Sequence, residues 1–178
     1  MRTSELILAI VAANGGYIEG KTVVQKIGYF CELRMSVRDN PVFLPHFYGP
    51  YSAQVDFELD KLVALGFLEQ STRTTINDRT IYGYKLTKQG KQVLQSISSS
   101  SGSEIAEVTN VVKTCKKYAG LNPLTLSYAA KVHLIAAEAK HPVTENDIII
   151  KAKDIGWKMN EKSVMSGARL LTVLKLAN

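Results

Sequence analysis

Residues 59–94, LDKLVALGFLEQSTRTTINDRTIYGYKLTKQGKQVL, constrain the fold of this chain more than any other segment. Leucines at helical spacing stop at Gly66, which predicts the end of a helix. Two β-prone segments, 67–72 and 80–86, flank a polar tip in which Asn77-Asp78 offers a turn. Thr87 is expected to cap a further helix, to about residue 97. Helix, two-stranded ribbon and helix in this order form the second half of a winged helix, a fold used mainly to bind nucleic acid.

The preceding residues supply the first half of that fold. Apolar side chains at spacings of three and four predict helices over 3–13 and 21–33, with a short strand near 17–18 between them. Pro41, Pro45 and Pro50 forbid a helix over 34–50, so this segment is expected to be a long insertion. Ser52 is expected to cap the next helix. Residues 1–98 therefore form the predicted winged helix-turn-helix domain.

The C-terminal part is expected to be all-helical. Residues 99–103, within the serine- and glycine-rich run, are predicted to be a flexible joint. Helical patterns follow over 105–119, 123–139, 144–155 and 160–174, so 104–178 forms a helical region for dimerisation or a second helix-turn-helix. The predicted fold class is mainly α with a small β-hairpin, that is α+β.

Charge and composition narrow the function classes. The net charge is +6, with +2 in residues 1–99 and +4 in residues 100–178, which favours a polyanionic partner. No apolar run is long enough to cross a bilayer, so we expect a cytoplasmic protein without a membrane partner. Cys31 and Cys115 are too few for a disulfide framework and are expected to be free thiols.

No motif indicates catalysis. His46, His133 and His141 lack metal-ligand spacing, and the chain has neither a phosphate-binding lysine loop nor a serine nucleophile elbow. The sequence therefore predicts no catalytic residue, no metal, no cofactor and no enzymatic activity.

A winged helix contacts duplex DNA through the starts of its second and third helices and through the ribbon tip, called the wing. Acidic residues Asp56, Glu58 and Asp60 oppose phosphate binding by the third helix, whereas the wing is basic. Charges on the wing are equally compatible with a solvated strand edge that prevents strand pairing. The candidate DNA-binding residues are Lys21, Thr22, Lys26, Ser52, Gln54, Lys61, Arg73, Arg79 and Lys85.

Two motifs carry a family resemblance. Residues 16–30, GYIEGKTVVQKIGYF, and 47–52, FYGPYS, resemble the YwgA-type winged-helix proteins, and more distantly the Panacea (SocA-like) antitoxin domain. Val24 departs from the leucine that often stands there. The resemblance implies a winged-helix-like fold, with DNA-binding regulation in some relatives and toxin neutralisation by protein contact in others. The Panacea-like motif is matched at Gln25, Lys26, Tyr29, Tyr48, Gly49 and Pro50.

Two functional hypotheses follow. The first is a prokaryotic-type transcriptional regulator, a homodimer through its C-terminal helices, that binds double-stranded DNA. The alternative is a protein-interaction module of antitoxin or adaptor type, without DNA binding, whose partner is a protein such as a toxin. In that case Phe47, Tyr48 and Tyr51 form the contact surface; otherwise they pack the insertion onto the second helix.

Overall fold

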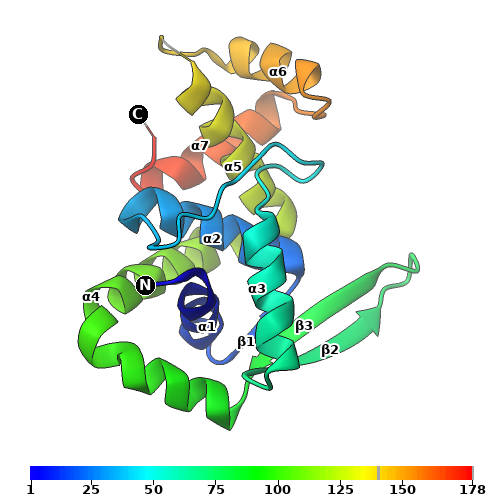
Figure 1. The fold of residues 1–178 in the computed structure, drawn as a ribbon. Coiled ribbons are helices and arrows are strands. Elements are labelled where there is room, and N and C mark those ends of the chain that lie inside the picture. Colours follow the sequence, from blue (N-terminus) through cyan, green and yellow to red (C-terminus); the bar gives the residue numbers. More distant parts are fainter. Residues whose placement is uncertain (140, 178) are drawn as a thin grey trace.

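The computed structural model describes residues 1–139 and 141–177 of the chain. It is mainly helical with one small antiparallel sheet, which confirms the predicted α+β class (Figure 1). The elements are α1 (Thr3–Ala13), β1 (Tyr17–Glu19), α2 (Lys21–Met35), α3 (Ala53–Ala64), β2 (Leu68–Thr74), β3 (Thr80–Leu86), α4 (Lys88–Ala119), α5 (Pro123–Glu138), α6 (Glu145–Asp154) and α7 (Glu161–Val173).

Side-chain caps start two of these helices where the sequence predicts. The Ser52 hydroxyl accepts a bond from the Val55 N–H at 3.4 Å, and the Thr87 hydroxyl accepts one from the Gly90 N–H at 3.1 Å. A capping box joins Thr144 and Asp147 at the start of α6. Each cap satisfies an N–H that has no partner within its helix, and so fixes where the helix begins.

The sheet has the order β1-β3-β2, with both pairs antiparallel. Ile18 lies opposite Tyr84, and Leu68 opposite Leu86, and all four side chains are buried. The rest of β2 is exposed along its whole length. Only the base of the β2–β3 hairpin therefore joins the core, and its tip projects away from the helices (Figure 1).

The segment predicted as a flexible joint is helical apart from a bend at one residue, so it is not an irregular linker. Residues 99–103 lie within α4, which runs from Lys88 to Ala119 and bends at Ser101, where φ is −123° and ψ is 23°. The hydroxyls of Ser96, Ser98 and Ser100 donate to carbonyls three residues earlier in the same helix. Such bonds keep serines compatible with a helix while favouring bending. The bend lets α4 wrap around α1 (Figure 1).

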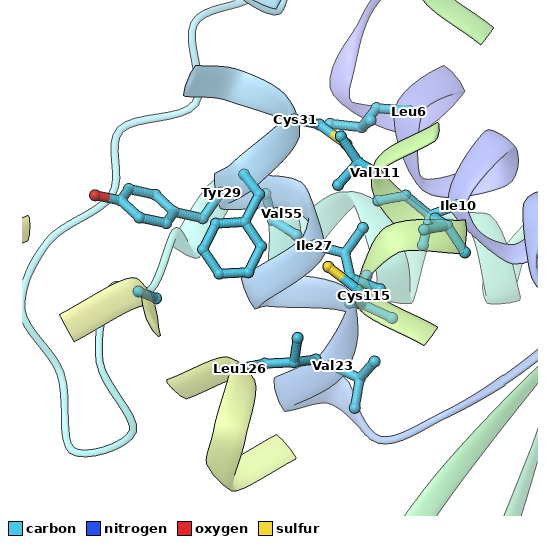
Figure 2. Packing of buried hydrophobic residues seen from close by; sticks show 14 of the residues in the cluster. Leu6, Ile10, Val23, Ile27, Tyr29, Cys31, Val55, Val111, Cys115 and Leu126 are labelled. Atoms are coloured by element: carbon cyan, nitrogen blue, oxygen red, sulfur yellow. The ribbon is translucent and has the colours of Figure 1, made fainter. Parts of the chain in front are cut away.

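One hydrophobic cluster joins the N-terminal and C-terminal regions. Leu6 and Ile10 of α1, together with Ile27 and Cys31 of α2, lie in the same buried cluster as Val111 and Cys115 of α4 and Leu126 of α5 (Figure 2). Both cysteines are free, as the sequence predicts, and both are buried. Because α5 packs on α2 and on α7, the C-terminal helices are built onto the N-terminal region.

The insertion between α2 and α3, residues 36–52, is held by hydrogen bonds at its C-terminal end. The Gln25 side chain donates to the Ser52 carbonyl and accepts from the Ser52 N–H, both at 2.9 Å. The Lys26 ammonium donates to the Pro50 carbonyl at 2.6 Å. The Trp157 indole N–H donates to the His46 carbonyl at 2.7 Å. The motif residues at 25–26 and 49–52 therefore contact each other, which gives them a structural role.

We expect Gln25→Ala to lower the free energy of unfolding by about 1–3 kcal/mol, because it leaves the buried Ser52 N–H without a partner, while the Ser52 carbonyl still accepts from the Asp56 N–H. Urea denaturation measures the change. The matched control is Gln70→Ala on the exposed face of β2, expected to change stability by about 0.5 kcal/mol or less. Equal losses in the two variants would contradict the structural role of Gln25.

Candidate interaction surfaces

The surface formed by the start of α2, the exposed side of α3 and the hairpin carries most of the predicted DNA-binding residues. Its cations are paired with acids of the same surface. Lys21 lies 3.2 Å from Asp56 and 3.0 Å from Asp60, and burial alone would lower its pKa, but these two acids outweigh burial and raise it. Lys61 lies 3.1 Å from Glu58 on its own helix.

The pairing continues across the sheet. Arg73 on β2 donates two hydrogen bonds to Glu19 on β1, at 2.6 and 2.8 Å, across the middle strand β3. The bond from Arg73 lowers the pKa of Glu19. Lys85 lies 4.0 Å from Glu69. A DNA phosphate near these cations would have to compete with carboxylates already in place, and would also be repelled by them.

Two predicted DNA-binding residues are buried, so these predictions are wrong. Lys26 is 2% exposed and holds the Pro50 carbonyl. Ser52 is 1% exposed, because its side chain caps α3 and its backbone pairs with Gln25. Thr22 and Gln54 are half-buried, and the Gln54 amide donates to the Thr3 hydroxyl at 3.4 Å.

Arg79, near the hairpin tip, differs from the other cations. It is exposed, and within residues 1–139 and 141–177 it makes no ion pair. It lies on the part of the hairpin that projects from the body (Figure 1).

A second surface, at the insertion and the start of α3, is apolar. We call it the insertion surface. Phe47 is 82% exposed and Phe57 65%, and several neighbours are also open to solvent. A shallow pocket of about 400 Å³ lies here, between the insertion and the first residues of α3. The exposed apolar residues of the surface are Val42, Leu44, Phe47, Tyr48 and Phe57.

The aromatic residues of the insertion have divided roles. Phe47 and Tyr48 are exposed and so do not pack on α2; instead Phe43 meets the Tyr29 ring edge-on at 5.2 Å. Tyr51 is half-buried, with its ring 5.0 Å from His46, and pairs with Leu44 in an isolated β-bridge. The insertion surface is therefore held on a fixed base while its outermost aromatic side chains remain free.

Beneath the insertion surface lie two buried lysines. Burial lowers the pKa of Lys26 to about 7, with a further contribution from the nearby charge of Lys131. Lys131 is itself buried, with its pKa lowered by burial and its ammonium 5.1 Å above the Trp157 ring. The Gly49 backbone lies against it: a Cβ at Gly49 would come within 3.1 Å of Lys131 Cγ, and φ there is +90°. Both lysines support the turn from below.

The described residues hold no group of three or more His, Cys, Asp or Glu side chains placed to bind a metal ion. His133 accepts or donates one bond, at 2.8 Å, with the Tyr29 hydroxyl, and burial lowers its pKa. His46 and His141 are exposed. In the part of the chain that the structure describes, no helix has the length and apolar character to cross a membrane.

Comparison of the chain with protein-family models and with curated proteins gave no match.

Sequence reasoning missed two parts of these surfaces. Val42 and Leu44 are apolar residues between prolines in an irregular segment, a pattern that could have indicated an exposed apolar surface. Lys131 and Trp157 gave no such signal. Lys131 lies against Gly49 and Trp157 bonds to the His46 carbonyl, and both contacts join residues that are far apart in the chain.

The lowered pKa of Lys26 predicts a pH-dependent stability. The unfolded chain has the ordinary lysine pKa of 10.5, so between about pH 7 and 10.5 it binds more protons than the folded chain. The free energy of unfolding of the wild type should therefore rise with pH in this window, by up to about 1.4 kcal/mol per pH unit from Lys26. Denaturation of wild type and Lys26→Met at several pH values measures the difference.

Groups other than Lys26 titrate in both proteins, so the difference between the two stability curves reports on Lys26. This difference in the free energy of unfolding should grow from pH 7 to pH 10. The exposed Lys88→Met is the matched control and should run parallel to the wild type. Parallel curves for Lys26→Met and wild type would contradict a neutral buried Lys26.

Proposed function

We propose that the chain is a protein-interaction module on a winged-helix-like scaffold, of antitoxin or adaptor type, and that it binds a partner protein through the insertion surface. One observation carries the proposal: the cations at the start of α2, on α3 and on the strands of the hairpin are paired internally, while the apolar side chains of the insertion surface are exposed.

The winged-helix interpretation is supported by the element order. Three helices, α1 to α3, precede the β2–β3 hairpin, and β1 joins the same sheet beside β3. The Ser52 cap and the Gln25 bonds hold the start of α3 next to α2. In a DNA-binding winged helix this end of the third helix is presented to the groove.

The insertion changes what is presented there. Phe57 on α3 and Leu44 in the insertion are exposed, and the pocket between the insertion and residues 53–54 of α3 is lined largely by apolar side chains. Exposed apolar surface marks protein-binding sites, and aromatic side chains are frequent among residues that dominate binding energy. The hydrogen bonds of Gln25, Lys26 and Trp157 hold the backbone of the insertion in place. Binding a partner would therefore cost little conformational entropy of this segment. A partner with an apolar face fits this surface.

Binding of duplex DNA, with a role in transcription regulation, is the second candidate. It is favoured by the projecting hairpin tip and by Arg79, which makes no ion pair with any described residue. Homodimer formation through the C-terminal helices remains a prediction for either candidate.

The partner proposal predicts losses of affinity on two variants. A photo-crosslinking residue at position 48 identifies the partner in the source cell, and the pair is then reconstituted from purified proteins. Tyr48→Ala and Phe57→Ala should each weaken binding about tenfold or more, since each removes an exposed aromatic from the contact. Titration calorimetry measures the affinities.

The control is Tyr118→Ala, a tyrosine of similar exposure on α4 that lies outside the insertion surface. It should leave partner affinity within about twofold of the wild type. Retention of full affinity by both Tyr48→Ala and Phe57→Ala would exclude the insertion surface as the binding site.

The DNA candidate predicts unequal effects of the two hairpin arginines. Arg79→Gln should reduce the slope of log affinity against log salt by about 0.9, because one phosphate contact is lost. Arg73→Gln should have a smaller effect, since Arg73 is already paired with Glu19. Gel-shift titrations with mixed-sequence duplex between ~50 and ~200 mM salt measure both. Absence of any shift at the lower salt would rule this candidate out.

A further inference from the structure

A furrow runs between the C-terminal half of α4 and α7, on elements that the insertion surface does not use. It consists of three hollows of about 490, 440 and 200 Å³. Tyr118 and Val173 line both the first and the second, and Thr114 and Lys175 line both the second and the third. The hollows are therefore continuous.

The furrow is strongly basic. Among the residues that the structure describes, none of its five exposed cations makes an ion pair, in contrast to those on α2, α3 and β2. Of the described residues, no acidic side chain lines any of the three hollows. Arg34, at one end, is bound to Glu107 and to the Leu174 carbonyl. The five free cations are Lys113, Lys117, Lys162, Arg169 and Lys175.

An aromatic ring stands among these charges. Tyr118 is 55% exposed, and the Lys117 ammonium lies 5.0 Å from the centre of its ring. The side chains of Met165 and Val173, both partly exposed, provide apolar surface beside it. The furrow thus combines unpaired positive charge with a flat ring that a planar group can cover.

We propose that this furrow binds single-stranded nucleic acid, with the lysines and Arg169 contacting phosphates and a base stacking on Tyr118. Binding sites for single strands combine a basic groove with exposed aromatic rings in this way. A duplex keeps its bases stacked inside and would leave Tyr118 unused. An acidic peptide would satisfy the charges but has no planar bases to place on the ring. The proposal goes beyond the proposed function, since it involves other residues and another class of partner.

Fluorescence anisotropy of a labelled twelve-residue oligothymidylate, titrated with the full chain, tests the proposal. If all five cations contact phosphates, log affinity should fall with log salt at a slope of about −3.5, which is about 100-fold between ~50 and ~200 mM salt. The variant Lys113→Gln/Lys117→Gln/Lys175→Gln should reduce the slope to about −1.4. Tyr118→Ala should weaken binding about fivefold or more at every salt concentration, and Tyr118→Phe should bind as the wild type does.

The matched control is Lys151→Gln/Lys153→Gln/Lys158→Gln, which removes the same charge from exposed positions on and just after α6. It should change the affinity by about twofold or less. An equal loss in this control, an unchanged affinity in Tyr118→Ala, or equally tight binding of a duplex of the same length would each overturn the proposal. Displacement of the oligonucleotide by polyglutamate at equal charge concentration would overturn it too, because the furrow would then be a general polyanion site.

The oligonucleotide-binding test does not depend on the proposed partner protein, because the two sites use different residues. Tyr118→Ala should weaken binding of the oligonucleotide and leave partner affinity unchanged, while Tyr48→Ala should weaken partner binding and leave oligonucleotide affinity unchanged. Failure of the nucleic-acid proposal can therefore be told apart from failure of the partner proposal.

Discussion

The contact of α2 with the turn before α3 is the interaction on which the rest of the structure depends. Gln25 satisfies both backbone groups of Ser52, and Lys26 holds the Pro50 carbonyl, all in buried positions. Without these side chains the Ser52 N–H and the Pro50 carbonyl would lose their partners, at a cost of about 1–3 kcal/mol each, whereas the Ser52 carbonyl also accepts from the Asp56 N–H. Their pairing fixes where α3 begins and anchors the long insertion. It thereby places the apolar insertion surface at the start of α3, where a nucleic-acid-binding winged helix would present polar residues.

The distribution of charge gives the three surfaces different characters. On α2, α3 and the hairpin strands, acids of the same surface pair with the cations, as in Lys21 with Asp56 and Arg73 with Glu19. Along the α4–α7 furrow the cations have no such partners among the described residues. The net charge of +6 thus says little about where a polyanion would bind. Its distribution favours a protein at the insertion surface and a nucleic acid at the furrow.

The bend at Ser101 brings the two regions together. A flexible joint would have left the C-terminal helices free to move, whereas a kinked helix lets α4 pass α1 and lay Val111 and Cys115 against α2 (Figure 2). The serine run misled the sequence analysis because its composition is typical of linkers. The serine hydroxyls bond to carbonyls of their own helix, so the segment remains helical without packing many apolar side chains.

The sequence alone determined the order of helices and strands, the caps at Ser52 and Thr87, and the irregular insertion, since each follows from local spacing or backbone chemistry. Only the tertiary structure decided which charged residues are available to a partner. Lys26 and Arg79 are both basic residues that the sequence offers as DNA contacts. Lys26 is buried and bonds to the Pro50 carbonyl, whereas Arg79 is exposed near the hairpin tip. The physical reason is that ion pairs and burial depend on contacts between distant segments, such as Glu19 with Arg73, which no local pattern encodes.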